Sequence, residues 1–231
     1  MGTARVLVGP ARGHRFQLES RSGIGQLWRR ASIAIGRYEP RVTSFLAENL
    51  RSCRVFFDIG ASTGYYTRIA LRLMDPTSRI VALEPDPRLA THLRSAFQDA
   101  RLSVRPEAAG RDDHEAVLEH SHGLASRIRS ESLLGPGFVA GGIVKVRSLD
   151  GMVERGELPS PDVVKIDVEG GELLVLEGMS RLLEHQPALA VECHSMSLLG
   201  EVLRTVNDRA YNRVEVTRGG DGIGPSTVLA R

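Results

Sequence analysis

Cysteine is scarce in this chain, which contains only Cys53 and Cys193. Two cysteines do not form the framework of paired bridges that holds many small secreted domains together. Each falls in a stretch that we predict to be a buried strand, and neither stands in the short paired spacing of a metal site. Buried free cysteines usually act as small apolar residues. This usage fits the reducing cytoplasm, where we expect the protein to be.

Long apolar runs are also missing from the sequence. A helix that crosses a membrane needs roughly 18 or more consecutive apolar residues, and no stretch approaches that length. The first residues lack the apolar segment of a secretory signal peptide as well. We therefore expect no association with a membrane.

A strong excess of one charge is absent, since the formal net charge is only +2. Proteins that bind nucleic acid usually gather many positive residues on one face. The balance therefore argues against a nucleic-acid partner. Homodimers are the commonest oligomers, and a homodimer is our default expectation for assembly.

The first 50 residues differ in pattern from the rest. Residues 1–25 are rich in Gly, Arg and Ser and predict a loop, whereas residues 26–50 predict one or two helices broken near Pro40. We interpret residues 1–50 as an N-terminal helical extension or lid, and residues 51–231 as the main domain.

Strands and helices alternate through the main domain. The predicted strands are Arg54–Ile59, Arg79–Leu83, Leu102–Arg105, Asp162–Asp167 and Ala188–Cys193. The predicted helices are Tyr65–Met74, Pro87–Asp99, Glu172–Glu184 and Ser197–Asp208, and a closing hairpin pairs Tyr211–Thr217 with Ser226–Ala230. Residues 110–142 predict short antiparallel strands and a surface loop. The alternation predicts an α/β fold whose parallel sheet is covered on both faces, and ligands bind such sheets beyond the carboxyl ends of the strands.

The first predicted strand runs into Asp58-Ile59-Gly60-Ala61-Ser62-Thr63-Gly64. Glycines at 60 and 64 let the backbone approach a ligand closely. The G-x-G-x-x-G pattern of dinucleotide-binding proteins is absent. A carboxylate at Asp58 repels a pyrophosphate but attracts a cation, such as the ammonium of a methionine moiety. The alternative is a tight turn without a ligand.

The second and third predicted strands also end near acidic residues. Glu84, followed by Pro85, stands 20 residues after Gly64, which is close to the spacing at which a carboxylate accepts hydrogen bonds from ribose hydroxyls. The third strand leads to Glu107 and Ala108, and small residues there leave room for a flat ring such as adenine. A small-residue turn without a ligand fits that third segment nearly as well.

The fourth and fifth predicted strands end in acidic residues and a histidine. Asp167 and Glu169 follow one strand, and Glu192 and His194 follow the other. Because these strands are expected to be neighbours, the four side chains converge on one rim, with Lys165 on the same face as Asp167. Carboxylates brought together in this way need a proton, a cation or a hydrogen-bond donor.

Two chemistries suit this rim. In the first, His194 or a carboxylate takes the proton of a substrate hydroxyl. In the second, Asp167 with Glu192 or His194 holds a divalent cation that lowers the pKa of the hydroxyl. Oxygen ligands favour Mg²⁺, and a histidine ligand shifts the preference toward a transition metal. The alternative without chemistry is that Glu169 caps the following helix and His194 is a loop residue.

Together these motifs resemble the FkbM-type family of S-adenosylmethionine (SAM)-dependent methyltransferases. The resemblance covers about residues 38–194. It is carried by the segments YEP (38–40), FFDIGASTGYYT (56–67), VALEPDP (81–87), EAAG (107–110), RSLDGMV (147–153), KIDVEGGELLVLEGM (165–179) and VECH (191–194). The segment 165–179 is the most specific, because the glycine loop is shared by most methyltransferases. Ser62-Thr63 departs mildly from the family, which usually has Asn or another residue there.

The resemblance implies a Rossmann-like class I methyltransferase fold, with a seven-stranded, mostly parallel sheet whose last strand is antiparallel. It assigns the methionine part of SAM to the glycine loop, the ribose to Glu84 and the adenine to the neighbourhood of Glu107 or Ala108. Asp167 then stands beside the point of methyl transfer. The full set of expected cofactor-binding residues is Asp58, Gly60, Ala61, Ser62, Gly64, Glu84, Pro85, Glu107 and Ala108.

The expected activity is that of a SAM-dependent O-methyltransferase acting on a hydroxyl of a saccharide or other natural product. Asp167, His194 and Glu169 are the candidate catalytic residues, and Asp167, Glu192 and His194 the candidate ligands of a divalent cation such as Mg²⁺. Two alternatives stay open, namely a module that binds SAM or a nucleotide without catalysis and a nucleotide-dependent oxidoreductase.

Overall fold

The computed structural model describes residues 2–18, 31, 34–121, 126–128, 138–218 and 225–231. Within this part of the chain, the main sheet has seven strands in the order β12-β13-β11-β10-β3-β4-β5. Their bounds are β3 Val55–Ile59, β4 Arg79–Leu83, β5 Leu102–Arg105, β10 Val163–Ile166, β11 Ala188–Cys193, β12 Val214–Arg218 and β13 Ser226–Ala230. β3, β4, β5, β10 and β11 run parallel, and β13 is antiparallel to both β11 and β12. The expected fold class is confirmed.

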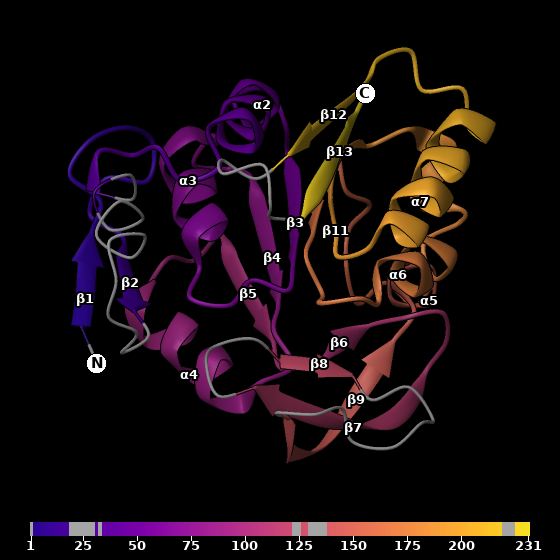
Figure 1. Ribbon diagram of the computed structural model, residues 1–231, viewed down its shortest axis with the longest axis horizontal. Helices are drawn as coiled ribbons and strands as arrows, with labels where there is room; N and C mark the ends of the chain where they lie inside the picture. The colour runs from indigo at the N-terminus through magenta and orange to yellow at the C-terminus, as the bar shows by residue number, and fades with distance from the viewer. Residues whose placement is uncertain (1, 19–30, 32–33, 122–125, 129–137, 219–224) are drawn as a thin grey trace.

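Helices cover both faces of the main sheet (Figure 1). One face carries α2 (Pro40–Leu50), α3 (Tyr65–Leu73) and α4 (Pro87–Ala96). The other carries α5 (Leu149–Glu154), α6 (Glu172–Glu177), the 3-10 helix Leu182–His185 and α7 (Met196–Asp208). Successive strand residues point to opposite faces, so Phe56 packs under α2 and α3 whereas Phe57 packs under the second set. Burial on both faces explains why the central strands are apolar at nearly every position rather than at every second one.

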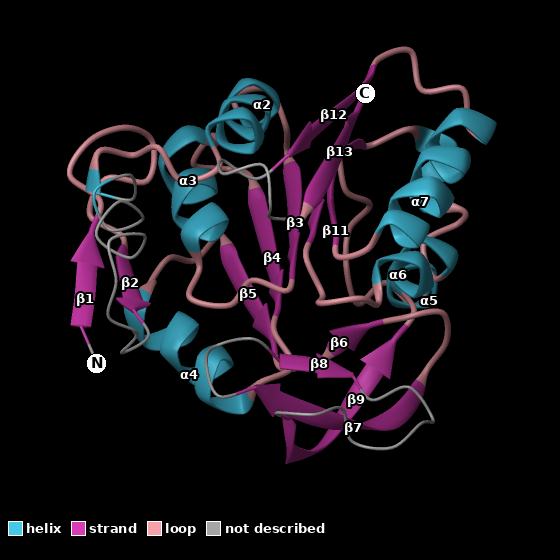
Figure 2. Cartoon of the chain, viewed as in Figure 1, coloured by secondary structure: helices cyan, strands magenta, loops and turns pink. Residues whose placement is uncertain are grey.

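A smaller sheet lies beside the carboxyl ends of the parallel strands (Figure 2). It has the order β6-β9-β7-β8, with β6 Ala108–Ala109, β7 His114–Ser121, β8 Ser126–Ile128 and β9 Phe138–Arg147. The stretch predicted as short antiparallel strands thus forms most of this sheet. Residues 122–125 and 129–137 lie outside the described residues.

The N-terminal prediction needs a correction. Residues 1–25 were expected to form a loop, but β1 (Gly2–Arg5) pairs antiparallel with β2 (Arg15–Leu18). Pro40 begins α2 at its first turn, where a missing N–H breaks no hydrogen bond. Cys53 is buried but precedes β3, so only Cys193 stands in a strand. In the described part of the chain, no helix is long and apolar enough to cross a bilayer.

Candidate active site

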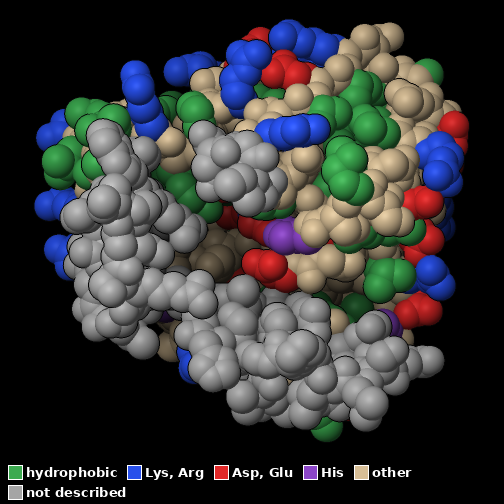
Figure 3. Space-filling view, viewed as in Figure 1, with side chains coloured by type: hydrophobic (Ala, Val, Ile, Leu, Met, Phe, Trp, Pro, Cys, Tyr) green, Lys and Arg blue, Asp and Glu red, His purple; other side chains and the backbone are tan. Residues whose placement is uncertain are grey.

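The carboxyl ends of β3, β4, β10 and β11 meet at one edge of the main sheet. On the face shown in Figure 3, acidic and histidine side chains gather around a hollow at this edge. Parallel neighbours end on the same side of a sheet, so residues distant in sequence are brought together there. The predicted site residues that follow these strands therefore share one surface.

Two glycines shape the loop between β3 and α3. Gly60 has a φ of +74°, and a Cβ added there would lie 1.8 Å from the carbonyl oxygen of Asp167. Gly64 has a φ of +82°, and its Cβ would meet Phe97 and Leu93 at 2.5 and 2.6 Å. Conformation and close contact both favour glycine at these positions. The loop backbone, including Ala61, therefore lies against the end of β10.

Asp58 is the acidic residue near the end of β3, and it is 1% exposed. Its Oδ2 accepts a hydrogen bond of 2.6 Å from the hydroxyl of Thr67, whereas Oδ1 is buried without a hydrogen-bond partner among the described residues. Burial raises the pKa of Asp58, and the charge of Lys165 opposes that shift. A buried oxygen that lacks a donor fits a ligand that brings one, such as the ammonium of SAM.

Glu84 connects the loops that follow β3 and β4. Its Oε2 accepts a 2.7 Å hydrogen bond from the backbone N–H of Ser62, and Oε1 accepts one of 2.9 Å from the N–H of Asp86. Burial raises the pKa of Glu84 to about 7, although these hydrogen bonds oppose the shift. Each carboxylate oxygen has a second lone pair for a ligand hydroxyl. Glu84, with Pro85 beside it, thus has the chemistry that a ribose requires.

Glu107 takes part in an ion-pair network. Its carboxylate lies 2.8 Å from Arg105 Nε and 3.1 Å from an Arg147 nitrogen, and Arg147 also pairs with Asp113 and Glu157. Ala108, the next residue, is buried and belongs to β6. Glu107 therefore joins β9 to the end of β5, and the prediction that adenine lies near these residues stays a prediction.

The rim formed by β10 and β11 brings together the four residues predicted to converge. His194 Nε2 lies 3.7 Å from Asp167 Oδ1 and 3.4 Å from Glu169 Oε2. Asp167, Glu192 and His194 each offer a ligand atom, and these atoms lie within 4.8 Å of one another. Helix α6 has no side-chain cap, so Glu169 does not act as one. The spacing fits both of the chemistries predicted for the rim.

Lys165 brings a positive charge to this rim. It is 4% exposed, and its Nζ lies 3.0 Å from Asp167 Oδ2 and 3.5 Å from the carbonyl oxygen of Gly60. Burial alone lowers the pKa of a lysine, but the charges of Asp167, Asp58 and Glu192 outweigh burial and raise the pKa of Lys165. Lys165 is therefore a fixed cation between the glycine loop and Asp167.

His194 is held by a carboxylate that sequence reasoning did not select. Its Nδ1 lies 2.6 Å from Oε1 of the buried Glu172, which also accepts the backbone N–H of Gly170. Burial opposes the charged form of His194, but Glu172, Glu169 and Asp167 outweigh it and raise its pKa to about 9. A histidine that is positively charged at neutral pH does not take a proton readily. A rim carboxylate is therefore better suited than His194 to accept a proton.

Glu192 is a second rim carboxylate, beside Asp167, with the chemistry to accept a proton. It is partly buried, and its carboxylate lies within 4.8 Å of ligand atoms of Asp167 and His194. Burial, together with the negative charges of Asp167 and Glu39, raises the pKa of Glu192 to about 8. A carboxyl group with a pKa near the working pH is suited to general base catalysis.

Two contacts from the N-terminal segment escaped sequence reasoning. Tyr66 donates a short hydrogen bond to Glu39, next to the rim. His14, which is 2% exposed, lies with Nε2 3.3 Å from the hydroxyl of Thr63 in the glycine loop. The only signal for the first contact was the position of Tyr38-Glu39-Pro40 within the family resemblance. His14 stands in a stretch predicted to be a loop, and no signal indicated its burial.

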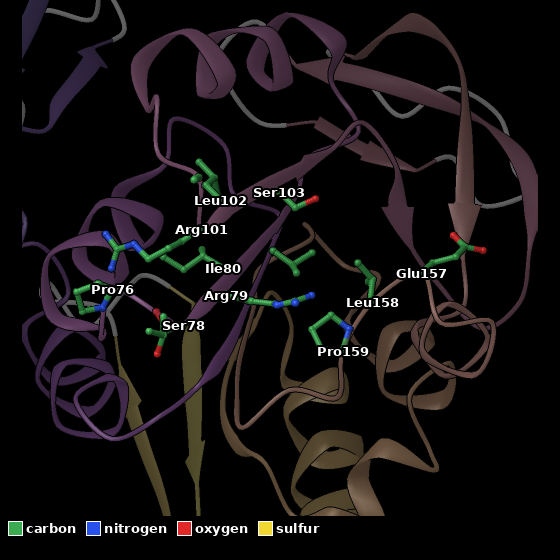
Figure 4. A pocket seen from close by; sticks show the side chains of 13 residues that line it. Pro76, Ser78, Arg79, Ile80, Arg101, Leu102, Ser103, Glu157, Leu158 and Pro159 are labelled. Atoms are coloured by element: carbon green, nitrogen blue, oxygen red, sulfur yellow. The ribbon is translucent and has the colours of Figure 1, made fainter.

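A separate cleft of about 450 Å³ opens at the amino ends of β4 and β5 (Figure 4). Its lining includes Arg79, Arg101, Ser103 and Leu158. The side chain of Arg101 is held by Asp99 and by the carbonyl oxygen of Leu71. This cleft lies at the opposite edge from the predicted site and contains none of the residues predicted for it.

Comparison with known proteins agrees with the fold and with the family resemblance. The methyltransferase FkbM domain matches residues 58–213, well over half of the chain. The chain belongs to the FkbM methyltransferase family. It is 28% identical over 181 residues to the hexuronic acid methyltransferase AglP of Haloferax volcanii, covering 78% of this chain and 70% of that protein.

Solved structures of methyltransferases share its fold. The methyltransferase FkbM of Methylobacillus flagellatus KT has a TM-score of 0.56 at 19% identity, covering 77% of this chain but only 43% of that one. An O-methyltransferase from Bacillus cereus, crystallised in complex with S-adenosylhomocysteine (SAH), has a TM-score of 0.52 at 15% identity and covers 89% and 87% of the two chains. Likeness at these identities shows the fold alone.

Proposed function

We propose that this protein is a SAM-dependent O-methyltransferase whose acceptor is a hydroxyl of a saccharide. The observation that carries the proposal is the contact between the two halves of the site. Gly60, in the loop expected to hold the methyl donor, lies against the carbonyl of Asp167, in the rim expected to hold the acceptor. Lys165 contacts both residues. Donor and acceptor sites that touch suit a direct transfer between them.

The donor side is supported by the chemistry of its residues. Oδ1 of Asp58, which has no hydrogen-bond partner in the described part of the chain, suits an ammonium, and the carboxylate of Glu84 suits ribose hydroxyls. When bound, SAM supplies a sulfonium methyl group that an oxygen nucleophile can take up. The chain's own contribution is to hold the donor with these carboxylates and with the backbone of the glycine loop.

The acceptor side favours a neutral oxygen. Asp167, Glu169 and Glu192 face the rim, and the nearby cations, Lys165 and His194, are already paired with carboxylates. An incoming carboxylate meets net repulsion there, whereas a hydroxyl can donate its hydrogen to a rim carboxylate. AglP is named for a hexuronic acid, a sugar with both kinds of oxygen. For this chain we propose hydroxyl methylation with Glu192 or Asp167 accepting the proton.

A divalent cation at Asp167, Glu192 and His194 is the second way in which the rim could work. The three candidate ligand atoms come from residues at the ends of two adjacent strands. Glu172 orients the ring of His194, as a carboxylate often does for a histidine that binds a metal. Such a cation would act as a Lewis acid and lower the pKa of the acceptor hydroxyl. Dialysis against EDTA should then abolish turnover, and Mg²⁺ or Mn²⁺ should restore it. Full turnover in EDTA would remove the cation from the proposal.

The central experiment offers radiolabelled SAM with p-nitrophenyl glycosides of glucose, galactose, glucuronic acid and galacturonic acid. The expected product carries a methyl ether, which survives mild alkali, whereas a methyl ester releases methanol. Loss of the label in alkali would show that a carboxylate is the acceptor. SAM binding without any methylated product would instead support the non-catalytic module. Calorimetry with NAD tests the oxidoreductase alternative, against which membership in a methyltransferase family already argues.

A further inference from the structure

Glu39 is an acidic residue of the N-terminal segment in an unfavourable backbone conformation. Its φ of 42° and ψ of 63° lie in the left-handed region, although it is not a glycine. Only glycine adopts this conformation without a free-energy cost, because a Cβ there comes close to the following carbonyl oxygen. Such strain persists where surrounding contacts hold it, and it is common at functional sites. Glu39 belongs to the YEP segment of the family resemblance and precedes residues 58–213, which match the family domain.

Aromatic and hydroxyl groups hold Glu39 in place. The hydroxyl of Tyr66, a buried residue of α3, donates a hydrogen bond to Glu39 Oε2. The hydroxyl of Thr43 donates a hydrogen bond of 2.9 Å to the carbonyl oxygen of Tyr38, and this bond fixes the turn before α2. The ring of Tyr65 meets those of Tyr38 and Tyr66 edge to face, with centroids 4.9 and 5.0 Å apart. The carboxylate therefore has a defined position.

That position is at the rim of the candidate active site. Lys165 Nζ lies 5.3 Å from the centroid of the Tyr66 ring that holds Glu39. Burial raises the pKa of Glu39, and the negative charge of Asp167 adds to the shift, while the hydrogen bond from Tyr66 and the charge of Lys165 oppose it. Glu39 is also one of the charges that raise the pKa of Glu192. A further carboxylate beside Asp167 and Glu192 opposes folding through repulsion and desolvation, so it needs another reason to be there.

We propose that Glu39 is an acceptor-positioning residue, whose carboxylate accepts a hydrogen bond from a sugar hydroxyl other than the one that is methylated. This inference rests on the proposed function. In this proposal the N-terminal segment completes the acceptor site by adding the carboxylate of Glu39 to those of Asp167 and Glu192. A polyhydroxylated acceptor suits this arrangement, because one hydroxyl faces Asp167 and Glu192 while a second one anchors the ring at Glu39.

The test compares Glu39→Gln with the wild type, using whichever of the four p-nitrophenyl glycosides the wild type methylates fastest. Hydrogen bonds to a charged group are worth about 10- to 100-fold in affinity. KM for the glycoside should rise by that factor, while kcat changes much less. The affinity for SAM should be unchanged, and the melting temperature unchanged or higher. Glu48→Gln is the matched control, since Glu48 lies on α2 but is exposed and paired with Arg231.

Monodeoxy forms of the same glycoside identify the contact. For one deoxy analogue, the wild type should lose about as much affinity as Glu39→Gln loses for the parent sugar. Glu39→Gln should bind that analogue no more weakly than it binds the parent sugar, because the same hydrogen bond is already missing. An unchanged KM in Glu39→Gln, or a lower melting temperature with loss of SAM binding, would overturn the positioning role while the proposed function stands. If the wild type methylates none of the four glycosides, the proposed function fails and this inference fails with it.

Discussion

Two groups of carboxylates lie at the same edge of the sheet, and they differ in what surrounds them. Asp58 and Glu84, on the proposed cofactor side, accept hydrogen bonds from Thr67 and from backbone N–H groups. On the acceptor side, the carboxylate of Glu192 has negatively charged neighbours, which include Asp167 and Glu39. The carboxylates of the first group accept hydrogen bonds that fix their direction, whereas those of the second group repel one another.

This difference separates binding from chemistry. A carboxylate that already accepts backbone hydrogen bonds has a defined direction and can hold a ligand hydroxyl with little rearrangement. Carboxylates that repel one another favour the arrival of a proton or a cation, and proton uptake is what methylation of an alcohol demands. Substitutions in the two groups should therefore impair different steps.

The largest effect is expected for Asp167→Asn. This change removes a charge at the proposed transfer point while keeping the volume of the side chain, and proton transfer by a positioned group is worth about 10²- to 10⁴-fold. We expect kcat to fall within that range while the Kd for SAM changes little. Steady-state kinetics with the glycosides and calorimetry with SAM measure the two quantities.

A control is needed because Lys165 loses its nearest carboxylate in this variant. The double variant Asp167→Asn/Lys165→Met removes both charges, and it should bind SAM while staying inactive. Normal turnover by Asp167→Asn would place the proton acceptor elsewhere on the rim.

Glu84→Gln should have the opposite profile. An amide keeps one acceptor oxygen but loses the charge, and hydrogen bonds to charged groups are worth about 1.5–3 kcal/mol. We expect the Kd for SAM to rise about 10- to 100-fold, with kcat at saturating SAM nearly unchanged. Glu115→Gln, on an exposed residue of β7, is a matched control. A fall in kcat without loss of SAM affinity would contradict the division between the two groups.

The fold could be predicted from sequence where burial alone defines an element. β4 and β11 have the predicted bounds because each is a mostly apolar, buried run between turn residues. The helix predicted over Glu172–Glu184 is wrong in its second half, since α6 ends at Glu177. A Cβ at Gly178 would lie 1.8 Å from the carbonyl oxygen of Gly110. This contact with a distant segment leaves no local signal.

The same limit applies to the site. Asp167, Glu192 and His194 could be placed together because the ends of neighbouring parallel strands meet. The contact between Glu39 and Tyr66, by contrast, depends on how the N-terminal segment packs across α3. Neither spacing nor periodicity encodes that packing.

The pH dependence of SAM binding tests the role of Glu84, because burial raises the pKa of Glu84 to about 7. The ionised carboxylate is the form that accepts ribose hydroxyls, and it makes up about a tenth of the protein at pH 6 and about nine tenths at pH 8. The Kd for SAM should therefore fall about tenfold between these values. SAM and the other titratable groups ionise in the same way in the wild type and in Glu84→Gln. The difference between their two pH profiles of the Kd for SAM therefore reports the ionisation of Glu84 alone. Parallel pH profiles would contradict its role.

His14→Ala should have the smallest effect, because His14 supports the glycine loop from outside the two groups. Burial, followed by the charges of Arg68 and His92, lowers the pKa of His14 to about 3, so its contact with Thr63 is made by a neutral ring at neutral pH. The loss should raise the Kd for SAM only about threefold, or about 0.7 kcal/mol.

The pH dependence of the free energy of unfolding is a more sensitive test of His14 than SAM binding is. A histidine whose folded pKa is lowered binds fewer protons in the native state, so the free energy of unfolding falls as pH drops below about 6.5. Between pH 6.5 and 5.5 the wild type should lose about 1 kcal/mol more than His14→Ala, as measured by urea denaturation. His185→Ala, on an exposed histidine, should behave as the wild type does. Equal losses in wild type and His14→Ala would mean that His14 is not buried against the glycine loop in solution.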